Sequence, residues 1–154
     1  MRSVAEALAD HCTSMNVPET PFVLHLPNVM HLATDVAGRL TNGASALALA
    51  RALHPSAAVC GTPKARADEV IGELEAMDRG RYAGPVGWID ARGDGEWGIA
   101  LRSGAIDRDD PRRMRLFAGC GVVAGSDPAA ELAESDAKLV PMRSALAADP
   151  TTPA

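Results

Sequence analysis

The stretch that most constrains this chain runs from Gly119 to Lys138, with the sequence GCGVVAGSDPAAELAESDAK. An apolar segment ends there in a Gly-x-Gly turn, and Ser126-Asp127-Pro128 is a typical helix start, with a capping side chain before a proline. Helical spacing places Glu131 and Lys138 about 20° apart in projection, with Glu134 about 60° to one side. The stretch therefore predicts a strand, a tight turn and a helix with two carboxylates and an ammonium on one face.

That helix face has two interpretations. Two carboxylates beside glycines, whose backbone N–H groups are open to a ligand, suit a divalent cation and an anionic substrate. A solvated helix face with a Glu134–Lys138 ion pair at (i, i+4) explains the same spacing. The neighbouring segments favour the first interpretation.

Length, composition and charge narrow the class of protein. The 154 residues fit one domain, and with 47% apolar but only 3% aromatic residues the core must consist largely of Ala, Val and Leu. The net charge of -5 argues against nucleic acid or an anionic membrane as partner. No apolar run reaches the roughly 18 residues of a spanning helix. Three cysteines without CxxC spacing indicate reduced thiols and a cytoplasmic protein.

The order of predicted elements is mixed. We predict an α+β fold, an antiparallel β-meander with flanking helices, over residues 1–146, followed by a disordered tail at 147–154. Helices are predicted at 2–13, 41–53 and 62–77 and from 126 onward, with a loop at 14–22 and a short buried segment at 56–61. Strands are predicted at 22–26, 29–40, 84–90, 96–106 and 113–123, with turns at 91–95 and 107–112.

Arg102 and Tyr82 are candidate anion-binding residues. By strand alternation, Arg102 shares a face with Gly98, Ala100 and Gly104, which leaves room for a bound carboxylate that its planar fork would match. An ordinary exposed arginine explains the pattern as well. The hydroxyl of Tyr82, the only tyrosine, could donate to the same carboxylate, or the ring could be a half-buried packing residue.

Cys60 and His31 allow a different chemistry. Cys60 precedes Gly61-Thr62-Pro63 near a predicted helix start, where a thiol pKa falls, so a nucleophile with His54 or His31 as its base is one hypothesis. The apolar neighbours of Cys60 favour an inert buried filler instead. His31 lies in an apolar strand, where it is either a hydrogen-bonded core histidine or a substrate donor.

Four segments, in order, resemble the C-terminal half of the chorismate-utilising enzymes, and within that family the isochorismate synthases. They are HLATDV at 31–36, the run from LHPSAAVCGTPK to GPVGWID at 53–90, GDGEWGIALRSGAI at 93–106, and RLFAGCGVVAGSDPAAELAESDAKL at 115–139. The resemblance implies a partial chorismate-binding-enzyme fold, a chorismate substrate and one Mg²⁺ ion.

The resemblance also implies roles for single residues. Glu131 would be a metal ligand, and Glu134 would support the metal shell directly or through water. Arg102 and Tyr82 would hold the enolpyruvyl carboxylate. The other implied substrate-binding positions are Gly119 and Gly121 through their backbone, Lys138 near the substrate and the metal carboxylates, His31 at the edge of the ring, and Ala58.

Ala58 distinguishes the subfamilies. Anthranilate and aminodeoxychorismate synthases usually have threonine there, in a pattern like HPAGTxSGAPK, and salicylate synthases also tend to have threonine. Isochorismate synthases typically have alanine, as in HPSAAVCGTPK here. The tryptophan of GPVGWID and the GDGEW turn favour the same subfamily. The resemblance thus implies an isomerase that converts chorismate to isochorismate, for siderophore or menaquinone biosynthesis.

The family's lysine general base, its glutamate general acid and a further metal-binding glutamate have matching positions upstream of Met1. We therefore expect a truncated C-terminal portion with no catalytic base or acid of its own and little or no activity in isolation, since each is worth roughly 10²–10⁴-fold. Two alternatives stay open: a non-catalytic remnant or half-domain that depends on a missing N-terminal half, and a sister enzyme that makes an aminated product.

Overall fold

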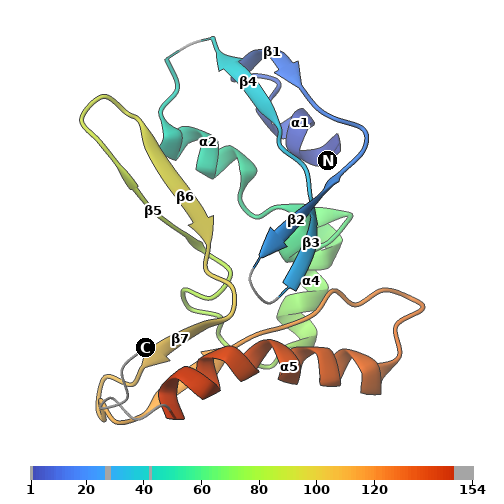
Figure 1. The fold of residues 1–154 in the computed structure, drawn as a ribbon, viewed down its shortest axis with the longest axis vertical. Helices are drawn as coiled ribbons and strands as arrows, with labels where there is room; N and C mark the ends of the chain where they lie inside the picture. Colours follow the sequence, from blue (N-terminus) through green and yellow to red (C-terminus); the bar gives the residue numbers. More distant parts are fainter. Residues whose placement is uncertain (1, 27–28, 42, 148–154) are drawn as a thin grey trace. The chain divides into compact units, whose positions relative to one another are not determined.

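The computed structural model (Figure 1) describes residues 2–26, 29–41 and 43–147. The chain divides into two compact units: unit 1 is Met1–Ile71 with Pro85–Gly98, and unit 2 is Gly72–Gly84 with Ile99–Ala154. Each unit mixes helices with antiparallel strand pairs, so the predicted α+β class is confirmed. Among the described residues, no helix is both long and apolar enough to cross a membrane.

Unit 1 holds most of the elements, and its strands form three separate two-stranded antiparallel sheets, β1 with β4, β2 with β3 and β5 with β6. Helix α1 packs against α2, and α2 packs against β5. The bounds are α1 Arg2–Leu8, β1 Cys12–Asn16, β2 Phe22–Leu26, β3 Val29–Ala33, β4 Ala37–Leu40, α2 Ala46–Leu53, α3 Ala57–Cys60, α4 Lys64–Leu74, β5 Pro85–Ile89 and β6 Gly95–Ile99. The last turn of α4 and Ile99 fall in unit 2.

Helix α2 shows how a local signal fixes an element. Ser45 is its N-cap, with the side-chain oxygen accepting a hydrogen bond from the Ala48 N–H at 3.2 Å. The Ala46 N–H donates to the Gly93 carbonyl at 2.8 Å, which ties the helix start to the β5–β6 turn. The helix ends at Leu53, before His54-Pro55, as proline geometry predicts.

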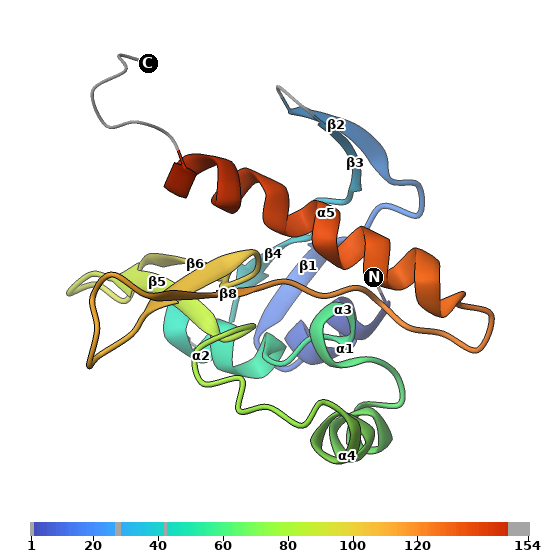
Figure 2. The same ribbon diagram turned by 90° about the horizontal axis from the view of Figure 1, so that it is seen from below.

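Unit 2 contains β7 (Ser103–Ile106), β8 (Met114–Phe117) and α5 (Pro128–Ala147). Strands β7 and β8 pair antiparallel, and α5, the long red helix in Figure 2, packs against β8. The Ala83 N–H donates to the Ala100 carbonyl and the Ala100 N–H to the Gly84 carbonyl, each at 2.9 Å. These two bonds join the segment 75–84 to the segment that leads into β7.

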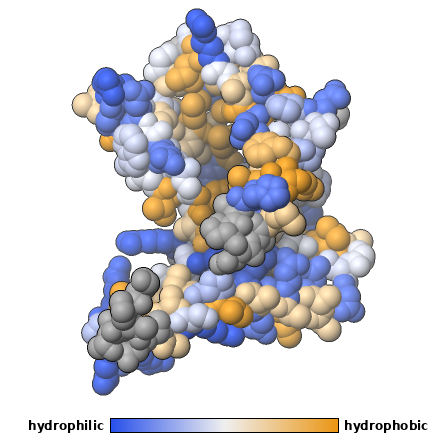
Figure 3. All heavy atoms as spheres, viewed as in Figure 1, coloured by the Kyte–Doolittle hydropathy of each residue, from blue (hydrophilic) through white to orange (hydrophobic). Residues whose placement is uncertain are grey.

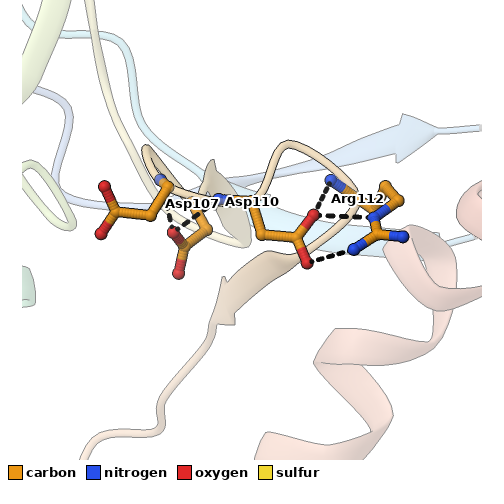
Figure 4. A network of polar contacts seen from close by, with 4 residues as sticks. Asp107, Asp110 and Arg112 are labelled. Atoms are coloured by element: carbon orange, nitrogen blue, oxygen red, sulfur yellow. Dashed lines mark hydrogen bonds and ion pairs between the residues drawn. The ribbon is translucent and has the colours of Figure 1, made fainter.

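The turn between β7 and β8 is built on aspartates (Figure 4). The Asp107 carboxylate accepts from the backbone N–H groups of Asp109 and Asp110, at 2.9 and 3.2 Å. Asp110 in turn accepts from the Arg112 guanidinium at 2.9 and 3.1 Å, and this contact holds the pKa of Asp110 below its usual range. The polar turn predicted at 107–112 is confirmed.

Few side chains are buried. Among the described residues, Cys60 and Ala83 are the buried apolar ones, and no polar residue is buried. Large apolar side chains remain exposed in both units, for example Leu32 at 75% in unit 1 and Leu132 at 66% in unit 2, and Figure 3 shows apolar side chains at the surface. Exposed apolar surface on this scale is typical of a surface that is covered by further polypeptide.

Several sequence predictions of elements are confirmed. Strand β2 has the predicted bounds 22–26, and α5 begins where Ser126-Asp127-Pro128 predicts. The short segment at 56–61 contains α3 with Cys60 buried. The predicted meander, however, is two hairpins, because β5 pairs with β6 and β7 with β8, but β6 does not pair with β7 in the described structure.

Other predicted bounds are wrong. The helix predicted at 2–13 ends at Leu8, because Cys12 and Thr13 pair with Leu40 and Arg39 instead. The predicted loop at 14–22 therefore begins with strand residues. The single strand predicted at 29–40 is two strands. The first, β3, pairs with β2, and the second, β4, pairs with β1.

The remaining corrections concern helix and strand ends. The helices predicted at 41–53 and 62–77 are Ala46–Leu53 and Lys64–Leu74, and the strand predicted at 113–123 is only Met114–Phe117. The strand predicted at 96–106 breaks before β7. Of the tail predicted to be disordered at 147–154, residue 147 ends α5, and residues 148–154 lie outside the described part.

Candidate functional site

Helix α5 carries the predicted face of two carboxylates and an ammonium. Asp127 caps the helix, since its side-chain oxygen accepts from the Ala130 N–H at 2.9 Å, and Pro128 occupies the first helical position. The cap fixes where the helix begins, and thereby which residues face the Gly-rich segment before it.

Lys138 connects this helix to the Gly-x-Gly turn. Its Nζ donates to the carbonyl of Gly119 at 2.9 Å and forms an ion pair with Glu134 Oε1 at 2.6 Å. Its side chain is only 25% exposed, whereas that of Glu134 is 55% exposed. The predicted ion pair of Glu134 with Lys138 is therefore present. Lys138 also binds Gly119, which lies 19 positions away in the sequence.

Glu131 is held as an anion. The Ser126 hydroxyl donates to its Oε1 at 2.6 Å. The pKa of Glu131 is lowered, first by this hydroxyl, then by a hydrogen bond from the Cys120 thiol and by the charge of Lys138. Sequence reasoning missed Ser126 and Cys120 as partners of Glu131; a hydroxyl placed five residues before a candidate ligand was the available signal.

Tyr82 lies beside Gly119. Its ring stacks on Phe117 with centroids 5.3 Å apart and planes at 16°, and the Arg79 guanidinium lies 5.8 Å from the ring centroid. A Cβ at Gly119 would come within 3.0 Å of the Tyr82 hydroxyl, so glycine permits this approach. Gly121 has nothing within 4 Å of such a Cβ, and its neighbourhood is open.

Arg102 lies in the break between β6 and β7, not in a strand. Its backbone is left-handed, with φ of 48°, so the predicted strand alternation does not apply to it. Its side chain is exposed and has no hydrogen-bond or ion-pair partner among the described residues. Strained backbone of this kind clusters at functional sites, which makes Arg102 a candidate.

The other predicted residues belong to unit 1. His31 lies in β3 opposite Leu24 and is exposed, so the core-histidine interpretation is wrong. Ala58 lies in α3 and is exposed. Cys60 is buried, and its thiol donates to Asp68 Oδ1 at 2.6 Å, which provides a carboxylate partner where the nucleophile hypothesis required a histidine.

A magnesium ion fits the chemistry of the donors on α5. The described residues hold no group of three or more His, Cys, Asp and Glu side chains arranged around a metal. Mg²⁺, however, commonly takes one or two protein carboxylates and completes its shell with water and substrate oxygens. Glu131 and Glu134 supply two hard oxygen donors of that kind, one of them held as an anion.

The chain belongs to a known family. A sequence profile described as chorismate binding enzyme matches residues 1–147. The chain is 44% identical over 148 residues to the isochorismate synthase DhbC of Bacillus subtilis, and 42% identical over 143 residues to the isochorismate synthase MenF of the same organism. These matches cover 96% and 93% of this chain, but only 36% and 30% of the two relatives.

Solved structures agree with the sequence relatives. A 2,3-dihydroxybenzoate-specific isochorismate synthase, DhbC from Bacillus anthracis, matches with a TM-score of 0.88 and 45% identity, over 96% of this chain and 39% of that one. Anthranilate synthase component I from Streptococcus pneumoniae matches with a TM-score of 0.80 and 30% identity, over 92% and 32%. The chain thus has part of the chorismate-binding-enzyme fold and spans about a third of its relatives' length.

Proposed function

We propose that this chain carries the metal- and carboxylate-binding part of an isochorismate synthase. Such an enzyme is an isomerase that converts chorismate to isochorismate with Mg²⁺. The observation that carries the proposal is the cluster of unit 2, in which Lys138 joins Glu134 to Gly119 and Glu131 is held as an anion. This cluster combines candidate cation ligands and an ammonium beside a backbone that is open to an anionic ring.

Each residue of the cluster would act on one part of a dianionic substrate. The free fork of Arg102 would bind a carboxylate through two parallel hydrogen bonds, with the Tyr82 hydroxyl as a further donor. Gly119 and Gly121 would let the ring approach the backbone, and Lys138 would balance the charge of the carboxylates. When bound by Glu131 and Glu134, Mg²⁺ would neutralise substrate charge as a Lewis acid.

The reaction adds water at C2 of chorismate and expels hydroxide from C4. It needs a base for the water and an acid for the leaving hydroxide, and we assign neither role to a residue of this chain. We therefore expect the 154 residues alone to turn over little chorismate. The substrate-binding roles of His31 and Ala58 stay predictions from the family resemblance.

A chimera tests this proposal without depending on the isolated chain. The 154 residues replace the matching third of B. subtilis DhbC, to which they are 44% identical. The chimera is expected to form isochorismate from chorismate only when Mg²⁺ is present. A folded chimera that binds neither chorismate nor Mg²⁺ would contradict the proposal.

A second candidate is a half-domain that binds anions without turnover until a partner polypeptide covers it. The exposed apolar side chains of both units favour this reading. Mixing the isolated chain with the separately produced remainder of DhbC tests it: activity that appears only on mixing supports partner dependence. Adding ammonium and searching for an aminated product tests the sister-enzyme alternative, which Ala58 disfavours.

We place the reaction in the cytoplasm. Cys12, Cys60 and Cys120 form no disulfide among the described residues, which suits a reducing compartment.

A further inference from the structure

Ser126 has no role in the proposed function, yet its hydroxyl contacts Glu131 directly. Its Oγ donates to Glu131 Oε1 at 2.6 Å and accepts from the Val123 N–H at 3.1 Å. A hydroxyl has one proton, so the hydrogen bond it accepts from Val123 leaves that proton for the carboxylate. The turn at 123–126 therefore holds one particular oxygen of Glu131.

This contact limits how Glu131 can meet a cation. The Ser126 hydroxyl occupies one lone pair of Oε1 through a short, charge-assisted hydrogen bond, whereas Ser126 donates no hydrogen bond to Oε2. Glu134 shows the same arrangement, because its Oε1 forms the ion pair with Lys138 at 2.6 Å. In each of the two carboxylates, therefore, a neighbouring side chain engages Oε1 and hinders binding of a cation through both oxygens at once.

Cations differ in how they use carboxylates. Mg²⁺ requires near-ideal octahedral geometry at about 2.0–2.1 Å and takes single oxygens together with waters. Ca²⁺ takes 6–8 oxygens at about 2.3–2.6 Å and often binds both oxygens of one carboxylate. A hydrogen bond to one carboxylate oxygen therefore weakens the binding of Ca²⁺ more than the binding of Mg²⁺.

We propose that Ser126 is a positioning residue that sets the metal selectivity of the site, by holding Glu131 in a single-oxygen binding mode that favours Mg²⁺ over Ca²⁺. The inference rests on the proposed function, in which Glu131 is a metal ligand. Removal of the hydroxyl frees Oε1 and lets Glu131 bind through both oxygens.

The test measures Mg²⁺ and Ca²⁺ affinities of the 154-residue chain by competition against Mn²⁺, with free Mn²⁺ followed by EPR. S126A is expected to lower the ratio of Mg²⁺ to Ca²⁺ affinity about tenfold, at the lower end of effects from groups that orient metal ligands. S126T keeps the hydroxyl and is expected to keep the wild-type affinity ratio. S126C supplies a weaker hydrogen-bond donor, so its ratio is expected to lie between those of the wild type and S126A. Ser144, an exposed serine of α5, provides the control S144A, which leaves the ratio unchanged.

The ratio separates positioning from damage to the fold, because partial unfolding weakens both cations together. If S126A binds no cation, S126C decides: an intermediate ratio supports the inference, and a wild-type ratio overturns it. Binding that E131Q removes, with a ratio unchanged in S126A, overturns the inference and leaves the proposed function intact. Mn²⁺ binding that is absent, or that survives E131Q, overturns the metal role of Glu131 itself.

Discussion

The two units use their polar side chains differently. In unit 1 the hairpins are held by backbone ladders, as in the register of β2 with β3, and the candidate residues His31 and Ala58 are exposed there. In unit 2, side chains from three segments meet: Tyr82 beside Gly119, Lys138 on the Gly119 carbonyl, and Ser126 on Glu131. The difference shows that unit 2 already contains an organised cluster, whereas the candidate residues of unit 1 have no such network among the described residues.

The largest expected effect falls on Glu131. In the chimera, E131Q is expected to lower kcat/KM about a thousandfold, because a neutral amide replaces a proposed ligand of the catalytic metal. The matched change in unit 1 is E69Q, in a helical glutamate that forms an exposed ion pair with Arg66. E69Q should leave kcat/KM within about twofold. Equal losses in the two variants would remove the contrast between the units.

Arg102 gives the next largest effect. R102A and R102G are both expected to weaken chorismate binding roughly 10- to 100-fold, since a charge-assisted fork is lost. R102G should also raise the free energy of unfolding by up to about 1 kcal/mol, because glycine adopts a positive φ without strain. R108A, in the exposed β7–β8 turn, serves as control for the lost positive charge. Calorimetric titration and denaturant unfolding measure the two quantities; binding unchanged in R102G would exclude Arg102 from the site.

A smaller effect tests the close approach of Tyr82 to Gly119. G119A is expected to lower the free energy of unfolding by about 1 kcal/mol, because its Cβ meets a hydroxyl whose ring is fixed by stacking. G121A, with open space around its Cβ, should change it little. In a Y82F background, G119A should lower the free energy of unfolding by less, because the Tyr82 hydroxyl oxygen nearest to the added Cβ is absent. An equal cost in both backgrounds would show that the two residues are not in contact.

The smallest effect concerns pH. The pKa of Asp110 is lowered by Arg112, so this pair stabilises the folded state above the ordinary aspartate pKa. That contribution is lost as pH falls through the lowered pKa, below about pH 4. Because the pair is exposed, we expect its loss to lower the urea midpoint only slightly between pH 5 and pH 2. The decrease should be smaller in D110N. An identical pH dependence in D110N would contradict this role.

Sequence reasoning predicted elements whose signals are local. The cap and proline at Asp127-Pro128 fix the start of α5, and the face of Glu131, Glu134 and Lys138 follows from helical spacing. The aspartate-rich turn at 107–112 follows from Asx-type hydrogen bonds within the turn.

Features that depend on partners distant in sequence could not be predicted. Cys12 pairs with Leu40, and this pairing ends α1 early although the helical pattern continues. The left-handed backbone of Arg102 interrupts a strand whose alternation looked regular. The spacing of Ser126 and Glu131 hinted at their contact but did not fix it, because the contact depends on the turn at 123–126.

The most direct measurement is the coupling between chorismate and Mg²⁺ in the chimera. Chorismate affinity, measured by calorimetric titration at increasing Mg²⁺, should rise with the metal, and Mg²⁺ affinity should rise equally with chorismate, because binding coupling is reciprocal. E131Q should abolish the coupling, and R102A should weaken chorismate binding with or without metal. Chorismate binding that is independent of Mg²⁺ and unaffected by R102A would contradict a shared site for the carboxylates of α5 and the Arg102 guanidinium.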